Sequence, residues 1–352
     1  MGFIYSQADE VIVVLTAQAR PVLEQITNKL ELLRPHLNIL EQEDWVTRAW
    51  TYQETVNAKR LRITCHDAPV GTIIDVFEFI SSLGQALNNM NSKDRTSYPR
   101  LNSFEDVMLD CATAGYLERS ALQVMSIMDE RTQTFPDDHF YAMIGAISTE
   151  PARPVNLLSP CEAFMSLCER KGDYSFIFSS NPRDPRPGRR WRPQGGPDLP
   201  AILRFPSTGS GLRGRVEQDY LVLENVVVMK PSSSSPDARA SIAQWLATFE
   251  WEGCDPNLSL EELASRTLQD FGFSGSPVCL ETDFGLFFPQ VQLPLLAQAD
   301  ILVAVGIQWR LGSPALARYQ ESLNNETVFY VPGVFLGKSA EAAGASATVI
   351  LV

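Results

Sequence analysis

The sequence predicts an α/β domain over residues 1–147 and an α+β region over residues 161–352. The run Val11–Leu15 is continuously apolar and rich in β-branched side chains, which is typical of a parallel strand buried on both faces. Segments with apolar residues at helical spacing follow this run. Because strand and helix alternate before helices take over, we expect a short parallel sheet with helical additions.

The other elements of the first half follow from spacing and terminal residues. A helix is expected over residues 21–33, because Pro21 suits a first helical turn and apolar side chains recur as far as Leu30 and Leu33. Residues 61–65 are predicted as a short strand. Further helices are predicted over residues 44–58, 72–87, 104–116 and 120–129.

Residues 44–58 should form one helix that packs on the sheet. Asp44 is predicted as its N-cap, because a carboxylate there can accept a hydrogen bond from an unpaired first-turn N–H. A 4-3-4 spacing indicates one apolar stripe that faces the core. This stripe consists of Trp45, Ala49, Tyr52 and Val56.

A second face of the same helix combines Trp50 with Glu54. At 100° per residue, Trp50 lies roughly 125° from the apolar stripe and Glu54 roughly 165° from it. One interpretation is a half-buried indole beside a solvated carboxylate. The other is a pocket wall, in which Trp50 lowers the local dielectric constant and Glu54 acts as an acid, a base or a charge stabiliser.

Three short motifs occur in order over the first 145 residues. Ile4, Tyr5 and Ala8 precede the first strand; Arg48, Trp50, Gln53, Glu54 and Ala58 occupy the predicted helix; and Pro136, Asp138, Tyr141, Ala142 and Gly145 occur in the run PDDHFYAMIG. This order resembles the fungal heterokaryon incompatibility (HET) domain. That family has an IY-x-x-A-x-x-V-x-V-x-L segment, an R-x-W-x-x-Q-E-x-x-x-A helix and a later D-x-x-Y-A-x-x-G segment.

The resemblance implies a cytoplasmic regulator or effector of programmed cell death triggered by non-self recognition. Such a protein acts through protein partners, and self-association is one form this can take. The HET domain is also distantly similar to TIR domains, which implies a TIR/flavodoxin-like parallel sheet. In those TIR domains that cleave NAD, a W-C-x-x-E helix carries the glutamate. Trp50 and Glu54 match that pair, with Thr51 in place of the cysteine.

The sequence departs from the HET pattern at its start. The family begins with a Y-x-A-L-S-Y-x-W-G segment and a W-I-D-x-x-C-I-N-Q strand, and neither is present. We therefore expect an N-terminally incomplete sheet. Two alternatives to the regulator follow, namely an NAD-cleaving enzyme with Glu54 as catalytic carboxylate and NAD as substrate, and an inactive fragment. The chain as given is expected to be inactive toward NAD.

Composition narrows the classes of partner. The formal net charge of −13 over 352 residues argues against nucleic acid and against anionic membranes, since both require basic surface. No apolar run is long enough to span a membrane. The six cysteines form no C-x-x-C pair, so neither a zinc ribbon nor a dithiol motif is predicted. Reduced thiols fit a cytoplasmic location. We expect no metal site and no resident cofactor.

Residues 148–160 hold three prolines and no apolar periodicity, which predicts a linker. Beyond it, residues 161–171 are predicted as a helix and residues 181–200 as a long irregular loop. That loop contains five arginines and Trp191, which we interpret as solvated loop rather than a phosphate-binding patch. Helices are also predicted at 241–250 and 258–271, and strands at 220–229, 301–307, 328–331 and 348–352.

Overall fold

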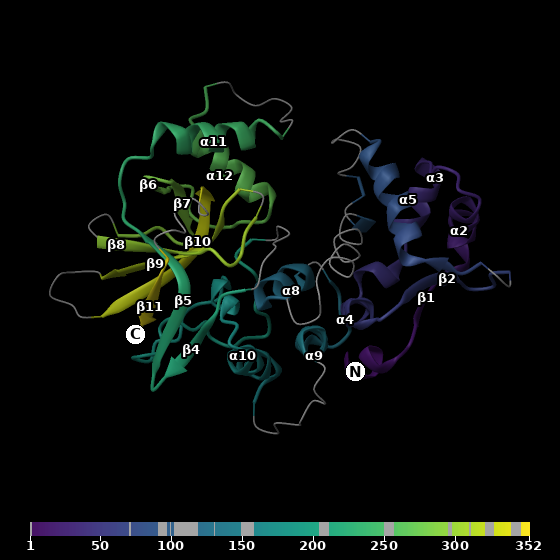
Figure 1. Ribbon diagram of the computed structural model, residues 1–352, viewed down its shortest axis with the longest axis horizontal. Helices are drawn as coiled ribbons and strands as arrows, with labels where there is room; N and C mark the ends of the chain where they lie inside the picture. The colour runs from purple at the N-terminus through teal and green to yellow at the C-terminus, as the bar shows by residue number, and fades with distance from the viewer. Residues whose placement is uncertain are drawn as a thin grey trace. The chain divides into compact units, whose positions relative to one another are not determined.

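A computed structural model contains both helices and strands, which confirms the mixed α and β composition (Figure 1). The chain divides into two compact units, residues 1–117 with 130–160 and residues 118–129 with 161–352. The structure describes residues 2–69, 72–90, 97–98, 100–101, 119–129, 131–148, 158–203, 211–249, 257–294, 298–309, 311–320, 327–338 and 346–352.

One helix departs from the predicted domain division. Helix α8 (Ala121–Met128) was expected in the first domain, but it belongs to the second unit. Two of its first backbone N–H groups explain this, because that of Ala121 donates to Asp173 Oδ2 (2.6 Å) and that of Leu122 donates to Ser175 Oγ (3.0 Å). Side chains of the second unit thus satisfy the unpaired donors at the start of α8.

The first unit contains a three-stranded sheet in the order β1 (Val11–Leu15), β2 (Leu61–Cys65) and β3 (Ile74–Asp75). Strands β1 and β2 are parallel, and β3 is antiparallel to β2. The predicted strands 11–15 and 61–65 are therefore confirmed with their bounds. The expectation of a parallel sheet is wrong at β3, which pairs with β2 in the antiparallel direction.

The prediction that β1 is buried on both faces is wrong. Val13 and Leu15 are buried in the core, but Ile12 is 46% exposed and Val14 is 45% exposed. The core cluster lies on the face of Val13 and Leu15, and it includes side chains of α2 and α5. Since side chains alternate along a strand, a core on one face leaves Ile12 and Val14 outside it.

The helix predicted at 21–33 ends early, because α2 spans only Arg20–Thr27. A separate helix, α3 (Arg34–Leu40), begins beyond the predicted range. Lys29 has a φ of 57°, and such a left-handed residue ends a helix. Leu30 and Leu33 are consequently exposed rather than part of a helical stripe. The 3-10 helix η1 (Ala17–Ala19) precedes α2.

The predicted helix 44–58 is divided. A 3-10 turn, η2 (Asp44–Thr47), is followed by extended backbone at Arg48 and then by α4 (Ala49–Asn57). Thr132 causes the break, because its N–H donates to the Thr47 carbonyl (2.7 Å) and its carbonyl accepts from the Ala49 N–H (2.9 Å). Asp44 therefore does not cap α4.

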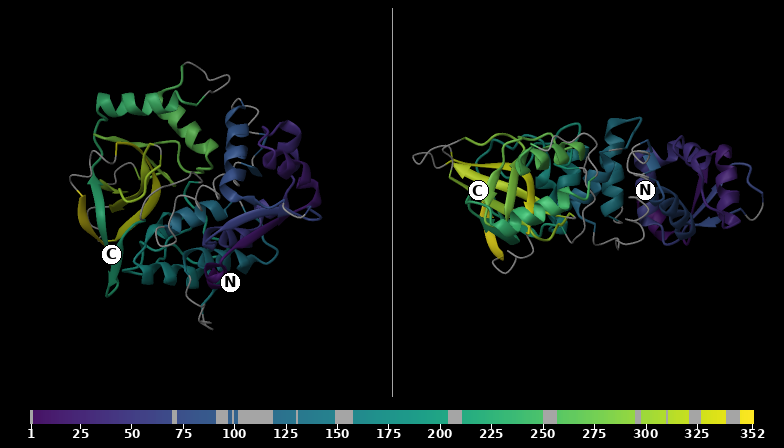
Figure 2. Two further views of the ribbon diagram at one scale, coloured as in Figure 1. Left: turned by 45° about the vertical axis from the view of Figure 1, so that its right-hand side comes forward. Right: turned by 90° about the horizontal axis from the view of Figure 1, so that it is seen from above.

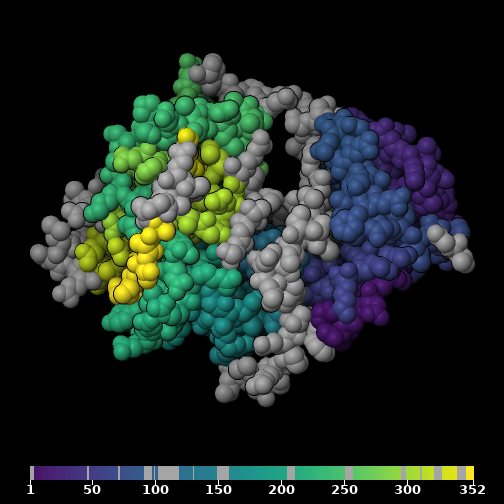
Figure 3. Space-filling model, viewed as in Figure 1, coloured from purple at the N-terminus to yellow at the C-terminus, as the bar shows by residue number. Residues whose placement is uncertain are grey.

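Three more helices complete the described part of the first unit, α1 (Gly2–Gln7), α5 (Val76–Asn88) and α9 (Pro136–Ile147). Asp75 caps α5 by accepting from the Phe77 N–H (2.9 Å), so this helix begins later than the predicted residue 72. Helix α2 contacts both α3 and α5, and the three form a continuous surface in the space-filling view (Figure 3). The helix predicted at 104–116 lies outside the described residues.

The second unit is built on one antiparallel sheet, in the order β11-β5-β8-β9-β10-β7-β6 with β4 paired to β5. Its apolar core includes Phe287, Ile301 and Phe335. The sequence predicted four of these strands and missed the others. The strands are β4 (Gly214–Glu217), β5 (Tyr220–Met229), β6 (Leu280–Thr282), β7 (Gly285–Pro289), β8 (Gln298–Ala304), β9 (Ser313–Gln320), β10 (Val328–Gly337) and β11 (Ser346–Leu351).

Helices flank this sheet. Helix α10 (Pro160–Lys171) ends at Gly172, as predicted, and the 3-10 helix η4 (Ser175–Phe178) follows it. Helices α11 (Pro236–Leu246) and α12 (Leu260–Asp270) contact each other, and α11 also contacts β7 and β10. Figure 2 shows this pair side by side at one end of the sheet.

The loop 181–200 is irregular as predicted, but it is not a solvated loop throughout. Trp191 and Arg192 are each 2% exposed. The Arg192 guanidinium is ion-paired with Glu162 (2.9 Å) and Glu169 (2.8 Å) of α10. The paired carboxylates make burial of this cation tolerable. Among the described helices, none has the length and apolar character to cross a bilayer.

Candidate functional site

Three helices of the first unit bring the sequence motifs together. Helix α1 contacts α4 and α9, and α4 contacts α9. These helices contain Tyr5, the motif of residues 48–58 and the motif of residues 136–145, respectively. Segments more than 80 residues apart in the sequence therefore meet at α4. We call this arrangement the motif cluster.

A hydrogen bond joins the first motif to the second. The Tyr5 hydroxyl donates to Glu54 Oε1 at 2.9 Å. Partial burial, the hydrogen bond to the Glu54 carboxylate and the negative charge of that carboxylate together raise the pKa of Tyr5 to about 12. The phenol therefore stays protonated at neutral pH and remains the donor.

A second bond joins α4 to α9. Asn57 Nδ2 donates to the carbonyl oxygens of Gln53 (2.8 Å) and Gly145 (2.7 Å). Gly145 lies in the last turn of α9, where carbonyl groups have no partner within the helix. Asn57 supplies the missing donor, so a polar side chain buried on α4 fixes the end of α9.

Arg131 binds residues at the N-terminal end of α4. Its Nη1 donates to the Arg48 carbonyl (2.8 Å) and to Thr51 Oγ1 (2.9 Å), and its guanidinium lies 5.5 Å from the centre of the Tyr52 ring. Thr51 in turn donates to the Arg48 carbonyl (2.6 Å). These bonds satisfy the backbone at the break before α4, where α-helical bonds are absent.

The remaining side chains of α4 divide between core and surface. Tyr52 is fully buried, as predicted, whereas Trp45 is only half-buried, because the break at Arg48 takes it out of the helix. Trp50 and Glu54 are both half-buried. That Trp50 lines a cleft beside Glu54 stays a prediction.

Gln53 is buried with both of its side-chain amide atoms lacking a hydrogen-bond partner within the described chain. Burying such an amide costs free energy, because its hydrogen bonds to water are lost and the described residues do not replace them. Gln53 belongs to the HET-like motif, yet its side chain makes no hydrogen bond with the described residues.

The other motif residues occupy less central positions. The Arg48 side chain is exposed, and only its carbonyl takes part in the cluster. Ala58 ends α4 and packs against the core of the first unit. Asp138 lies within the first turn of α9, which Phe135 rather than Asp138 caps, and Tyr141 is exposed.

The chemistry open to this arrangement is limited. Glu54 Oε1 accepts a hydrogen bond from Tyr5, and no described residue donates to Oε2. The carboxylate can accept one further hydrogen bond or act as a base toward a ligand at that oxygen. The described residues contain no group of three His, Cys, Asp or Glu side chains arranged to hold a metal.

The sequence did not indicate Arg131 and Asn57, although each donates two hydrogen bonds in the cluster. Neither belongs to the HET-like pattern. Asn57 had one available signal, since a polar residue one turn after Gln53 interrupts the apolar side of a helix. Arg131 had none, because its partners lie about 80 residues earlier.

Comparison with known proteins adds no relative. No family model matches the chain, and no match is found among curated proteins or solved structures.

Proposed function

We infer that this chain is a heterokaryon-incompatibility-type regulator or effector of non-self-triggered cell death that acts through protein contacts. One observation supports this above the others. The three HET-like motifs, separated in the sequence, pack together through the Tyr5–Glu54 and Asn57–Gly145 hydrogen bonds. A chance match of short motifs carries no requirement that they meet in space.

Action through contacts rather than catalysis is supported by the use of the polar groups. Tyr5 and Asn57 each form a hydrogen bond that joins α4 to another helix, and Arg131 forms one to the residue before α4. The proposal places the protein in the cytoplasm, with protein partners that can include a second copy. Two parallel strands in the first unit are compatible with a TIR/flavodoxin-like sheet.

NAD cleavage is the second candidate. It is favoured by Oε2 of the half-buried Glu54, which accepts no hydrogen bond from the described residues. In this reading Glu54 would act at a ribose, beside Trp50. The two candidates differ in a measurable way. A contact-based effector leaves cellular NAD unchanged, whereas a glycohydrolase depletes it through Glu54.

Induced expression in fungal cells, with viability and NAD content followed together, tests both. We expect loss of viability with constant NAD, and an equal loss for Glu54→Gln. The matched control is Glu78→Gln, which removes an exposed carboxylate on α5. Unchanged viability on expression contradicts the effector, and NAD loss that Glu54→Gln alone abolishes establishes the enzyme instead.

A further inference from the structure

A pocket of about 630 Å³ lies within the second unit. Ser166, Glu169 and Arg170 line it from α10, and Val216 and Gln218 line it from the β4–β5 hairpin. Pockets of about 300–1,000 Å³ hold ligands of drug or cofactor size. This pocket is far from the HET-like motifs in the sequence and takes no part in the proposed function.

The charge on the pocket wall is positive, although the chain as a whole is strongly acidic. Three arginines line it, namely Arg170, Arg189 and Arg215, against two carboxylates, Glu169 and Asp219. Glu169 is already neutralised by the buried Arg192 at 2.8 Å. In a chain of net charge −13, three guanidinium groups around one pocket favour an anion over a cation as its ligand.

The three arginines are not equally available. Arg215 is ion-paired with Glu217 (2.6 Å) and Glu224 (2.9 Å). Arg189 Nε lies 3.9 Å from Asp184 Oδ2. The same carboxylate is ion-paired with Arg186. Arg170 is exposed, and none of the described residues pairs with its guanidinium. Arg170 and Arg189 are therefore the cations most able to turn toward a ligand.

The floor of the pocket is rigid. The rings of Tyr174 and Trp191 meet edge to face with centroids 5.9 Å apart, and Trp191 Nε1 donates to the Gly188 carbonyl (3.0 Å). Burial raises the pKa of Tyr174 to about 12, with the nearby Glu169 charge acting in the same direction. The Tyr174 phenol therefore stays neutral at neutral pH, and both rings of the aromatic floor are almost fully buried.

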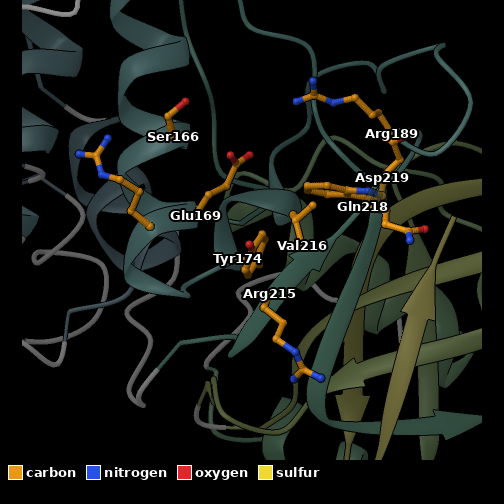
Figure 4. Close-up of a pocket in the computed structure, with 10 residues that line it drawn as sticks. Ser166, Glu169, Tyr174, Arg189, Arg215, Val216, Gln218 and Asp219 are labelled. Carbon is orange, nitrogen blue, oxygen red and sulfur yellow. The ribbon is translucent and has the colours of Figure 1, made fainter.

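Figure 4 shows how these groups lie around the pocket. Ser166 and Glu169 project from α10 on one side, and Arg189 and Gln218 lie on the other, with Tyr174 and Val216 between them. Hydroxyl and amide groups suit the hydroxyls of a sugar, and the guanidinium group suits the oxygens of a phosphate.

We propose that this pocket binds an organic phosphate of nucleotide size, with Arg189 and Arg170 on the phosphates and the Tyr174–Trp191 floor under the apolar part. The pocket volume exceeds what inorganic phosphate needs. A long polyanion such as nucleic acid is disfavoured, because the acidic remainder of the chain repels it.

Isothermal titration calorimetry of the full chain with ADP tests this proposal. We expect saturable binding that weakens as salt increases, since guanidinium–phosphate attraction is screened. Replacement of both cations in Arg170→Gln/Arg189→Gln should weaken binding at least about tenfold, because charge-assisted hydrogen bonds are lost. The matched control Arg266→Gln, an exposed arginine on α12, should leave binding unchanged.

Three comparison ligands sharpen the outcome. Inorganic phosphate and adenosine should each bind more weakly than ADP, because each occupies only one part of the pocket. Absence of ADP binding, equal weakening by Arg266→Gln, or equal affinity for adenosine overturns the proposal. Equal affinity for citrate also overturns it, because the site would then select carboxylates rather than phosphates. Glu54→Gln should leave ADP affinity unchanged, which separates this pocket from the motif cluster.

Discussion

The surroundings of α4 and the core beside β10 are stabilised in opposite ways. Helix α4 buries four polar side chains. Two of them, Thr51 and Asn57, form hydrogen bonds with residues far away in the sequence. Strand β10 buries Val334, Phe335 and Leu336 against the equally apolar β7. Buried hydrogen bonds distinguish the surroundings of α4, whereas the core beside β10 is stabilised by burial of apolar surface.

This difference predicts which substitutions each region can accept without losing stability. Apolar burial is non-directional and scales with area, so the sheet core should lose stability in proportion to the volume removed. Buried hydrogen bonds have modest net value, but a partner left unpaired is expensive. The motif cluster should therefore respond to the identity of each polar residue rather than to its size.

The largest effect is expected in the sheet. Phe335→Ala should reduce the free energy of unfolding of the second unit by about 3–5 kcal/mol, because it leaves a cavity among fully buried aromatic rings. Denaturant unfolding gives the total, and amide hydrogen exchange assigns the loss to the second unit. Phe284→Ala, at a partly exposed turn, is the control; an equal loss there would contradict the area argument.

Arg131→Met should have the next largest effect, a loss of about 2–3 kcal/mol in the first unit. The methionine keeps much of the volume but leaves the Arg48 carbonyl and the Thr51 hydroxyl without this donor. Hydrogen exchange of the α4 amides measures the change. Arg60→Met removes an exposed arginine of the same unit, and a matching loss there would show that charge alone matters.

Two buried amides on α4 provide a matched comparison. Asn57→Leu should cost about 1–2 kcal/mol, because Gly145 loses its donor. Gln53→Met should be neutral or stabilising by up to about 1 kcal/mol, because its amide atoms lack partners within the described residues. Denaturant midpoints of the two variants decide the point, and a loss of similar size in both would remove the distinction between directed and undirected burial.

The smallest effects are expected at the Tyr5–Glu54 pair. Glu54→Gln and Tyr5→Phe should each change stability by less than about 1 kcal/mol, since both side chains are partly exposed. The pKa of Tyr5 is raised from about 10 to about 12, so the folded chain keeps a proton that the unfolded chain releases. This stabilising contribution is complete below pH 10 and is lost as pH rises toward 12.

Unfolding measured at pH 9, 10 and 11 checks this sign. Stability of the unmodified chain should fall more steeply above pH 10 than that of Tyr5→Phe. Tyr174 also has a pKa raised to about 12, so only the difference between the two chains isolates Tyr5. Parallel pH profiles would show that the Tyr5 hydroxyl is not held by Glu54 in solution.

Local sequence determined much of the secondary structure. The strands at 11–15, 61–65 and 220–229 have their predicted bounds, because continuous runs of β-branched and apolar residues leave few alternatives. The helix that ends at Gly172 was equally predictable, since glycine tolerates the left-handed conformation that stops a helix.

Tertiary structure decided where those elements break and which polar groups meet. Thr132 interrupts the helix predicted at 44–58 from a position 85 residues later than Thr47, and Asn57 reaches Gly145 across 88 residues. Periodicity reports only on neighbours within a few turns. A buried polar group needs a partner wherever the fold supplies one, and no local pattern encodes the position of that partner.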